Sequence, residues 1–180
     1  MKKLIATILV FALIFISFPM TTYAQSQLSV LRKGGFVNLS TEDMSDTIQA
    51  LCDKICKDCG VPHHTISCYD WPESATLAYN TLYGCNIICV NLSGFRTTED
   101  ADAAGETVEY HLVKTIAHEV RHGYQWYHQN DDSDYGRACR QGFASYSDYS
   151  GDRAAYYAQF IEADAEDYAV KYANKYFGKK

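Results

Sequence analysis

The sequence predicts an α+β domain in which a short mixed sheet packs against three long helices. Apolar residues recur at helical spacing in three segments, residues 41–59, 106–128 and 152–177. Between the first two segments lie short runs rich in β-branched and aromatic residues, which are typical of strands. Residues 25–180 contain no internal repeat and no low-complexity segment, so we expect them to form one domain.

The N-terminal residues have the three parts of a secretory signal peptide. A basic start at residues 1–3 precedes an apolar run at residues 4–18, and a small-residue cleavage site ends at Ala24. The apolar run is shorter than the roughly 20 residues that span a bilayer as a helix, and Pro19 closes it. We therefore expect cleavage after Ala24 and a secreted or cell-envelope domain that no longer contacts the membrane. An uncleaved N-terminal anchor is the alternative.

Charge excludes one class of partner. The chain has 16 basic and 22 acidic side chains, and removal of residues 1–24 would take away Lys2 and Lys3 but no acid. The expected exported domain therefore has 14 basic and 22 acidic side chains. Nucleic-acid binders carry concentrated basic patches, so we expect no nucleic-acid partner. We expect a monomer.

The chain is rich in cysteine. Its seven cysteines are Cys52, Cys56, Cys59, Cys68, Cys85, Cys89 and Cys139. In an exported domain cysteines usually form disulfides, and an odd number leaves at least one unpaired. The pair Cys56 and Cys59, followed by His63 and His64, is the alternative, because it could be half of a structural zinc site.

The first expected elements lie before the sheet. Residues 25–39 are expected to include one short strand, with a turn at Gly34 and Gly35. Ser40 is a helix cap followed by acidic residues, and this helix should end near Cys59, where a glycine and a proline follow.

Three strands and two loops are expected next to the long helices. The strands cover residues 65–71, 76–79 and 84–92, and the last is the strongest because it is rich in β-branched residues. Residues 97–105 and 129–151 are expected to be loops, because acidic residues and turn formers dominate them.

The second long helix carries the motif His118-Glu119-Val120-Arg121-His122. Residues four apart lie one helical turn above each other, so His118 and His122 can bind one ion. Glu119 then lies within reach of a water molecule on that ion. Zinc binds neutral imidazole and lowers the pKa of its bound water towards roughly 7, and a carboxylate can take the proton as general base.

The residues around the motif divide into two faces of the expected helix. The face expected in the core carries Val113, Ile116, Ala117, Val120, Tyr124 and Tyr127. The face expected to form the wall of a cleft carries His111, Thr115, His118, His122 and Gln125.

Catalytic zinc sites usually have three protein ligands. His128 would lie about 9 Å further along a continuous helix than His122 and could not reach the same ion. Glu162 is the better third ligand. It lies in a stripe of small residues on the last helix, where a carboxylate is unfavourable unless a positive partner meets it. A solvated charge on an exposed face is the alternative. Asp164 lies about 200° away on the helical wheel, whereas Glu166 could accept a hydrogen bond from a ligand histidine.

The motif and the segment Glu162-Ala163-Asp164-Ala165, some 40 residues later, resemble the gluzincin class of zinc metallopeptidases. The size of the chain resembles the small bacterial members of that class, the minigluzincins. The resemblance implies a zincin-like fold, one catalytic Zn²⁺ held by His118, His122 and Glu162, and hydrolysis of a peptide or protein substrate with Glu119 as base. In that family an aspartate usually stands four residues after the ligand glutamate, and here that position is Glu166.

The resemblance also implies which residues contact the substrate. By analogy, residues 85–91 would be an edge strand along the cleft, and Asn86, Ile88 and Val90 would lie against an extended substrate backbone.

An oxyanion donor is also required of a hydrolase. Tyr149 and Tyr156 are our choices, because both lie close in sequence to the ligand helix. The other candidates are Tyr135, Tyr146, Tyr157, Arg137 and His111. A second hypothesis is a secreted binding module with a structural or vestigial metal site, in which the tyrosine-rich residues 129–151 contact a partner.

Overall fold

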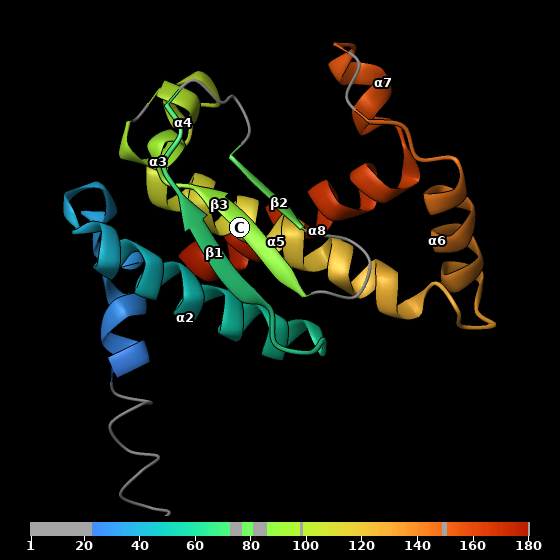
Figure 1. Cartoon of the computed structure of the whole chain (residues 1–180), viewed down its shortest axis with the longest axis horizontal. Helices are drawn as coiled ribbons and strands as arrows, with labels where there is room; N and C mark the ends of the chain where they lie inside the picture. The colour runs from blue at the N-terminus through green and yellow to red at the C-terminus, as the bar shows by residue number, and fades with distance from the viewer. Residues whose placement is uncertain (1–22, 73–76, 81–85, 98, 149–150, 180) are drawn as a thin grey trace, which may run out of the picture.

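The computed structural model describes residues 23–72, 77–80, 86–97, 99–148 and 151–179, and it has the α+β fold of a mostly helical chain with a small mixed sheet (Figure 1). Residues 23–33 are helical. The elements that follow are η1 (Phe36–Asn38), α2 (Thr41–Cys59), β1 (Thr65–Tyr69), β2 (Ala78–Asn80), β3 (Ile87–Asn91), α3 (Ser93–Arg96), α4 (Glu99–Ala103), α5 (Val108–His128), α6 (Asp134–Ala144), α7 (Arg153–Tyr157) and α8 (Phe160–Phe177).

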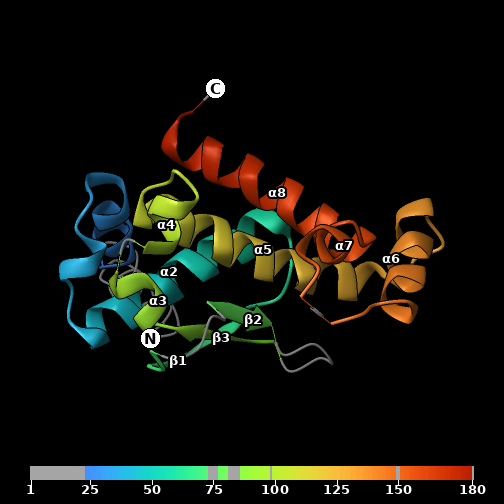
Figure 2. The same ribbon diagram turned by 90° about the horizontal axis from the view of Figure 1, so that it is seen from above.

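The elements form layers. Helices α2 and α5 cover one face of the sheet, and α8 packs along the opposite side of α5 (Figure 2). The short helices α6 and α7 lie at the end of the molecule where α5 finishes and α8 begins, whereas α3 and α4 lie near the start of α5. None of the described helices is long and apolar enough to cross a bilayer.

The sheet has the strand order β1-β3-β2, with β1 parallel and β2 antiparallel to β3. The prediction that residues 85–91 form an edge strand is therefore wrong, because β3 is the central strand. Ile88 and Val90 are fully buried, as expected of a strand paired on both sides and covered by helices. The edge strand beside α5 is β2.

The core lies between the sheet, α2 and α5, and a second contact joins α5 to α8. Ile116, Ala117 and Val120 of α5 are fully buried, which confirms that this part of the predicted face is in the core, but the prediction is wrong for Tyr127, which is 42% exposed. Ala165 and Ala169 of α8 are also fully buried. Because alanine has a short side chain, two helices that meet at alanines can approach closely. This approach brings the α8 residue Glu162 to the surface of α5.

Helix α2 begins and ends where the sequence predicts, and α5 begins and ends within two residues of its predicted bounds. The Ser40 hydroxyl accepts a hydrogen bond from the Asp43 N–H at 3.1 Å, and Gly60 ends α2 with a φ of 75°. Thr107 caps α5 in the same way, by accepting from the Tyr110 N–H at 3.2 Å. The three strands are also confirmed within the described residues, although β1 ends at Tyr69 and β2 extends to Asn80.

Four other predictions of secondary structure are wrong. Residues 25–39 contain most of a helix and a 3₁₀ turn and no strand, and residues 97–105 contain α4. Residues 129–151 contain α6. Ser133 is not a loop residue there but the cap of α6, and its hydroxyl accepts from the Gly136 N–H at 3.0 Å. The expected last helix is two helices, because the chain leaves the helical conformation at Gln159.

Candidate metal centre

Three side chains from two helices meet at one point. His118 and His122 of α5 and Glu162 of α8 each offer one ligand atom, and these atoms lie within 4.8 Å of one another. Glu162 Oε2 is 3.2 Å from His118 Nε2, and Glu162 Oε1 is 3.6 Å from His122 Nε2. This group could bind a metal ion.

The packing of α8 on α5 determines where Glu162 lies. The carboxylate is in the first turn of α8 and only 1% exposed, between the two imidazole rings. The rings lie one turn apart on α5, with centroids 4.7 Å apart. A buried carboxylate is strongly unfavourable without a positive partner, so this donor set fits a divalent cation.

The charges of the site also favour a cation. Burial alone would lower the pKa of His118, but hydrogen bonds to Glu162 and Glu166 raise it to about 10. Burial would raise the pKa of Glu162, yet the hydrogen bond from His118 and the charge of the two histidines lower it to about 2. Burial and the charge on His118 lower the pKa of His122. Without a metal the site therefore holds a proton on His118 in the place of a cation.

Glu119 lies in the same cleft wall as the ligands and is 7% exposed. The Asn80 N–H donates to Glu119 Oε2 at 2.8 Å, and Asn80 Nδ2 donates to the Glu119 carbonyl at 2.9 Å. Gly123 leaves room for His64, since a Cβ there would lie 2.5 Å from His64 Nε2, whereas its 3.6 Å distance from Asn80 Nδ2 would be an ordinary contact. The strand β2 is thus fixed to α5 beside Glu119.

A cleft of about 110 Å³ opens over the three ligands. It is lined by Ala78, Tyr79, Asn80, His118, Glu119, His122, Tyr146, Tyr156, Ile161 and Glu162. One wall is therefore the edge strand β2 and its neighbour α5, and the other consists of residues near α7 and the start of α8.

Two tyrosines connect this second wall to Glu162. The Tyr146 hydroxyl donates to Glu162 Oε1 at 2.8 Å and lies 2.8 Å from the Tyr156 hydroxyl. Gln159 keeps Tyr146 there, because its amide makes hydrogen bonds of 2.7 and 2.9 Å to the Ser147 backbone. Tyr156 therefore lies in the cleft, and its role as oxyanion donor stays a prediction. Tyr149 lies outside the described residues.

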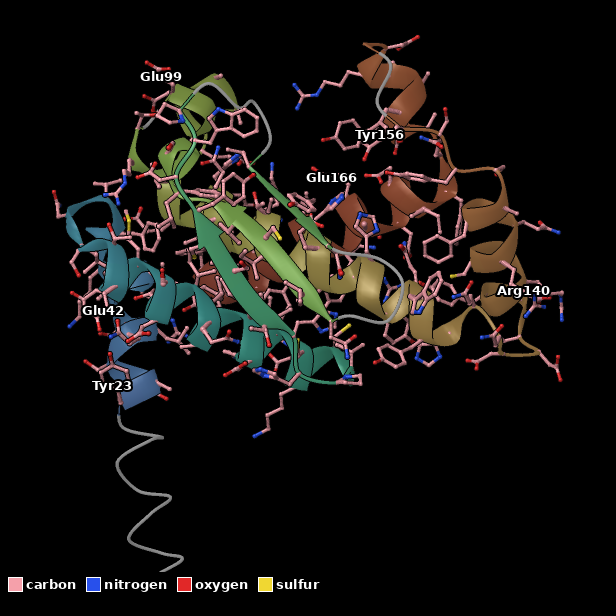
Figure 3. All side chains as sticks on the ribbon, viewed as in Figure 1. Tyr23, Glu42, Glu99, Arg140, Tyr156 and Glu166 are labelled. Atoms are coloured by element: carbon pink, nitrogen blue, oxygen red, sulfur yellow. The ribbon has the colours of Figure 1, made fainter. Side chains whose placement is uncertain are left out.

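Glu166 and Asp164 lie in different places on α8. Glu166 Oε2 is 3.5 Å from His118 Nδ1, where it can orient that ring, and Figure 3 shows Glu166 on the same side of the molecule as Tyr156. Asp164 lies away from the ligand atoms, as its position on the wheel predicts. It accepts hydrogen bonds from Arg121, Gln125 and Tyr135.

The residues predicted to contact a substrate do not reach the cleft. Ile88 and Val90 have their side chains in the core, and the Asn86 amide makes hydrogen bonds to the Tyr127 hydroxyl at 3.1 and 3.2 Å. This follows from the central position of β3. The cleft residues of the sheet are Ala78, Tyr79 and Asn80 of β2.

Three site residues were not singled out by the sequence. Gln125 is on the predicted cleft face of α5, but its partner Asp164 depends on how α8 packs. Tyr146 was one of several tyrosine candidates. Nothing in the sequence marks Asn80, because its role depends on the pairing of β2 beside α5.

The cysteines form neither of the expected arrangements. The six described cysteines are all free thiols, so the prediction of disulfides is wrong for them, and Cys85 lies outside the described residues. Cys56 Sγ is 3.5 Å from His64 Nδ1. Among the described residues, however, His118, His122 and Glu162 form the one group with the spacing of metal ligands, so the alternative of a second zinc site has no support.

Comparison with family models, characterised proteins and solved structures finds no match to this chain. The chemistry of the site is therefore what indicates its function.

Proposed function

We propose that this protein is an exported zinc metallopeptidase that hydrolyses peptide bonds in peptide or protein substrates. The observation that carries the proposal is the meeting of His118, His122 and Glu162 in a cleft that also contains Glu119. Two imidazoles and one carboxylate are the ligands of one type of catalytic zinc site, which keeps a position open for water. A purely structural site has no use for a carboxylate base beside its ligands.

Glu119 is the proton carrier in the proposed reaction. Bound zinc would supply Lewis-acid activation of water and of the scissile carbonyl. Glu119 takes the proton of the attacking water as general base and later delivers it to the leaving amine. The Asn80 N–H holds one carboxylate oxygen at 2.8 Å, so the carboxylate is already oriented and its other oxygen can bind the water.

The strand β2 is the proposed binding site for the substrate backbone. It ends the strand order of the described sheet and lines the cleft with all three of its residues. An extended peptide can pair with such an edge, and this pairing recognises backbone more than side chains. In this proposal β2 takes the role that the sequence had predicted for β3. Export to the secreted or cell-envelope space is proposed from the pattern of residues 1–24.

The test compares variants of residues 25–180 by metal analysis and by cleavage of an unfolded protein such as reduced casein. Glu119→Gln should keep one zinc per chain and lose roughly 10²- to 10⁴-fold in kcat, the range for a general base. Glu162→Ala should lose both zinc and activity. Glu99→Gln makes the same change as Glu119→Gln on exposed α4 and is the matched control.

Two outcomes would reject the proposal. If wild type and Glu119→Gln cleave equally well, Glu119 is not the base. If the wild type binds zinc at unit stoichiometry and cleaves no member of a peptide library, the hypothesis of a secreted binding module with a structural metal site is the better one.

A further inference from the structure

We propose that Gln125 and Asp164 together fix His122 in the tautomer that carries its proton on Nδ1 and leaves Nε2 free for the metal. This assigns a positioning role to two residues that are not ligands. Its purpose rests on the proposed function, but the tautomer is a property of the metal-free protein and can be measured without metal or substrate.

The first step is the orientation of the Gln125 amide. Gln125 is fully buried, and its Nε2 lies 2.8 Å from the Ile161 carbonyl oxygen and 2.9 Å from Asp164 Oδ2. Both neighbours are acceptors. An amide has two N–H donors on its nitrogen and none on its oxygen, so the nitrogen must face this pair.

The second step follows from the first. With its nitrogen turned to α8, Gln125 presents Oε1 to His122 Nδ1 at 2.9 Å. This oxygen can only accept, so Nδ1 must carry the hydrogen. In a neutral imidazole the other nitrogen then has the lone pair, and His122 Nε2 is the atom that faces Glu162, 3.6 Å from Oε1.

Asp164 allows only one of the two orientations of the Gln125 amide. Its carboxylate accepts hydrogen bonds from Arg121 Nε at 2.8 Å, Arg121 Nη2 at 3.0 Å and the Tyr135 hydroxyl at 2.8 Å. Because three donors from Arg121 and Tyr135 face this carboxylate, its oxygens act as acceptors. The Arg121 guanidinium is itself held over the rings of Tyr124 and Tyr168, at 4.3 and 5.1 Å.

The two ligand histidines are thus positioned by different means. His118 Nδ1 faces the Glu166 carboxylate directly, at 3.5 Å. His122 Nδ1 instead faces a neutral amide, and the carboxylate of Asp164 acts through that amide. Asp164 is not one of the three ligands, and in this proposal it still determines which nitrogen of His122 can bind a metal.

The test is the ¹⁵N spectrum of the histidine rings in metal-free protein at pH 8, with His122 assigned from its absence in His122→Asn. A ring nitrogen with a hydrogen and one with a lone pair have well-separated shifts. The wild type should show the Nδ1–H form of His122. A wild-type spectrum with the hydrogen on Nε2 overturns the proposal without any variant.

Two variants test the two residues. Gln125→Met keeps the side-chain length but removes the acceptor, so the Nε2–H form should appear, and zinc affinity should fall roughly 10- to 100-fold, as for other partners of ligand histidines. Gln129→Met makes the same change four residues on, where the amide donates to the Trp126 carbonyl. This control should change neither the His122 tautomer nor the zinc affinity. Asp164→Asn can offer Gln125 a donor and should give a mixture of tautomers.

The outcomes are separable from those of the proposed function. If Gln125→Met keeps the wild-type ring spectrum, Gln125 does not select the tautomer. If Asp164→Asn keeps it, the Asp164 part of the proposal is overturned, and this near-isosteric variant remains informative even if Gln125→Met does not fold. A protein with the predicted tautomer and no peptidase activity would reject the proposed function and leave this inference standing.

Discussion

The α5–α8 side of the cleft and the rim formed by β2, Tyr146 and α7 differ in how deeply their residues are buried. Glu162 and Gln125 are at most 1% exposed. Gln125 makes hydrogen bonds to His122 of α5 and Ile161 of α8, and Glu162 accepts one from Tyr146. On the rim, Tyr157 is 37% and Tyr79 46% exposed, and α7 has no buried residue. The helix pair is therefore suited to hold a metal in fixed geometry, and the rim to contact a molecule that enters from solvent.

The same comparison predicts which changes affect folding and metal affinity and which affect catalysis. The helix pair is stabilised by close packing and by a buried ion pair that substitutes for a metal, so changes there should alter both folding and metal affinity. The strand and helix of the rim have only 3 and 5 residues, and the rim's contact to the ligand Glu162 passes through tyrosine hydroxyls. Changes on the rim should alter catalysis more than folding.

The largest effect should come from the proton that His118 holds in the metal-free site. Its pKa of about 10 means that zinc must displace this proton throughout the neutral range. Zinc affinity should therefore rise about tenfold per pH unit, or roughly 100-fold from pH 6 to pH 8. Chelator competition at several pH values measures this slope. An affinity that does not change with pH would show that His118 is not charged in the metal-free site.

The same proton gives a stability change of known sign. The folded-state pKa of His118 lies above its ordinary value of 6.5, so its contribution to metal-free stability is complete below that value and is lost as the pH rises towards 10. Glu162 contributes above its ordinary value of 4.5, and this contribution is lost as the pH falls towards 2. Because the two groups are one ion pair, these contributions are not additive.

The second effect concerns packing, and it compares the two regions directly. Ala169→Leu inserts a larger side chain into the closely packed α5–α8 contact and should destabilise the fold by about 1 to 3 kcal/mol. Ala154→Leu makes the same change on exposed α7 and should stay within about 0.5 kcal/mol of wild type. Urea unfolding of the two metal-free variants measures the difference. Equal losses would mean that α7 is packed as tightly as α8.

The contrast between the regions also explains what the sequence could predict. His118, His122 and Glu162 lie on long helices, where a regular 3.6-residue period places each side chain on a known face. The Ser40 cap of α2 is a local signal. The rim depends on non-local contacts, and no local pattern states that β2 pairs with one side of β3 and leaves that strand in the centre.

The missed helix α6 has a local cause. Ser133 and the acidic residues around it are turn formers by composition, but the same residue types cap helices and occupy the first helical turn. Composition alone does not separate the two uses. The break between α7 and α8 was missed because the alanine-rich sequence on both sides continues the helical pattern through Gln159.

The smallest effect should come from Tyr156→Phe on the rim. The Tyr156 hydroxyl makes a hydrogen bond to the Tyr146 hydroxyl, which in turn donates to Glu162. Loss of the Tyr156 hydroxyl therefore removes a neutral hydrogen bond that does not contact the ligand directly. Such a bond contributes about 0.5 to 1.5 kcal/mol, and we expect an unchanged zinc content and at most a tenfold fall in kcat. Tyr146→Phe, which removes the direct donor to Glu162, should cost more and also weaken zinc binding. If Tyr156→Phe instead lowers kcat by 10²- to 10³-fold at constant zinc content, the hydroxyl leaves Tyr146 during the reaction and donates to the oxyanion, as the sequence had predicted.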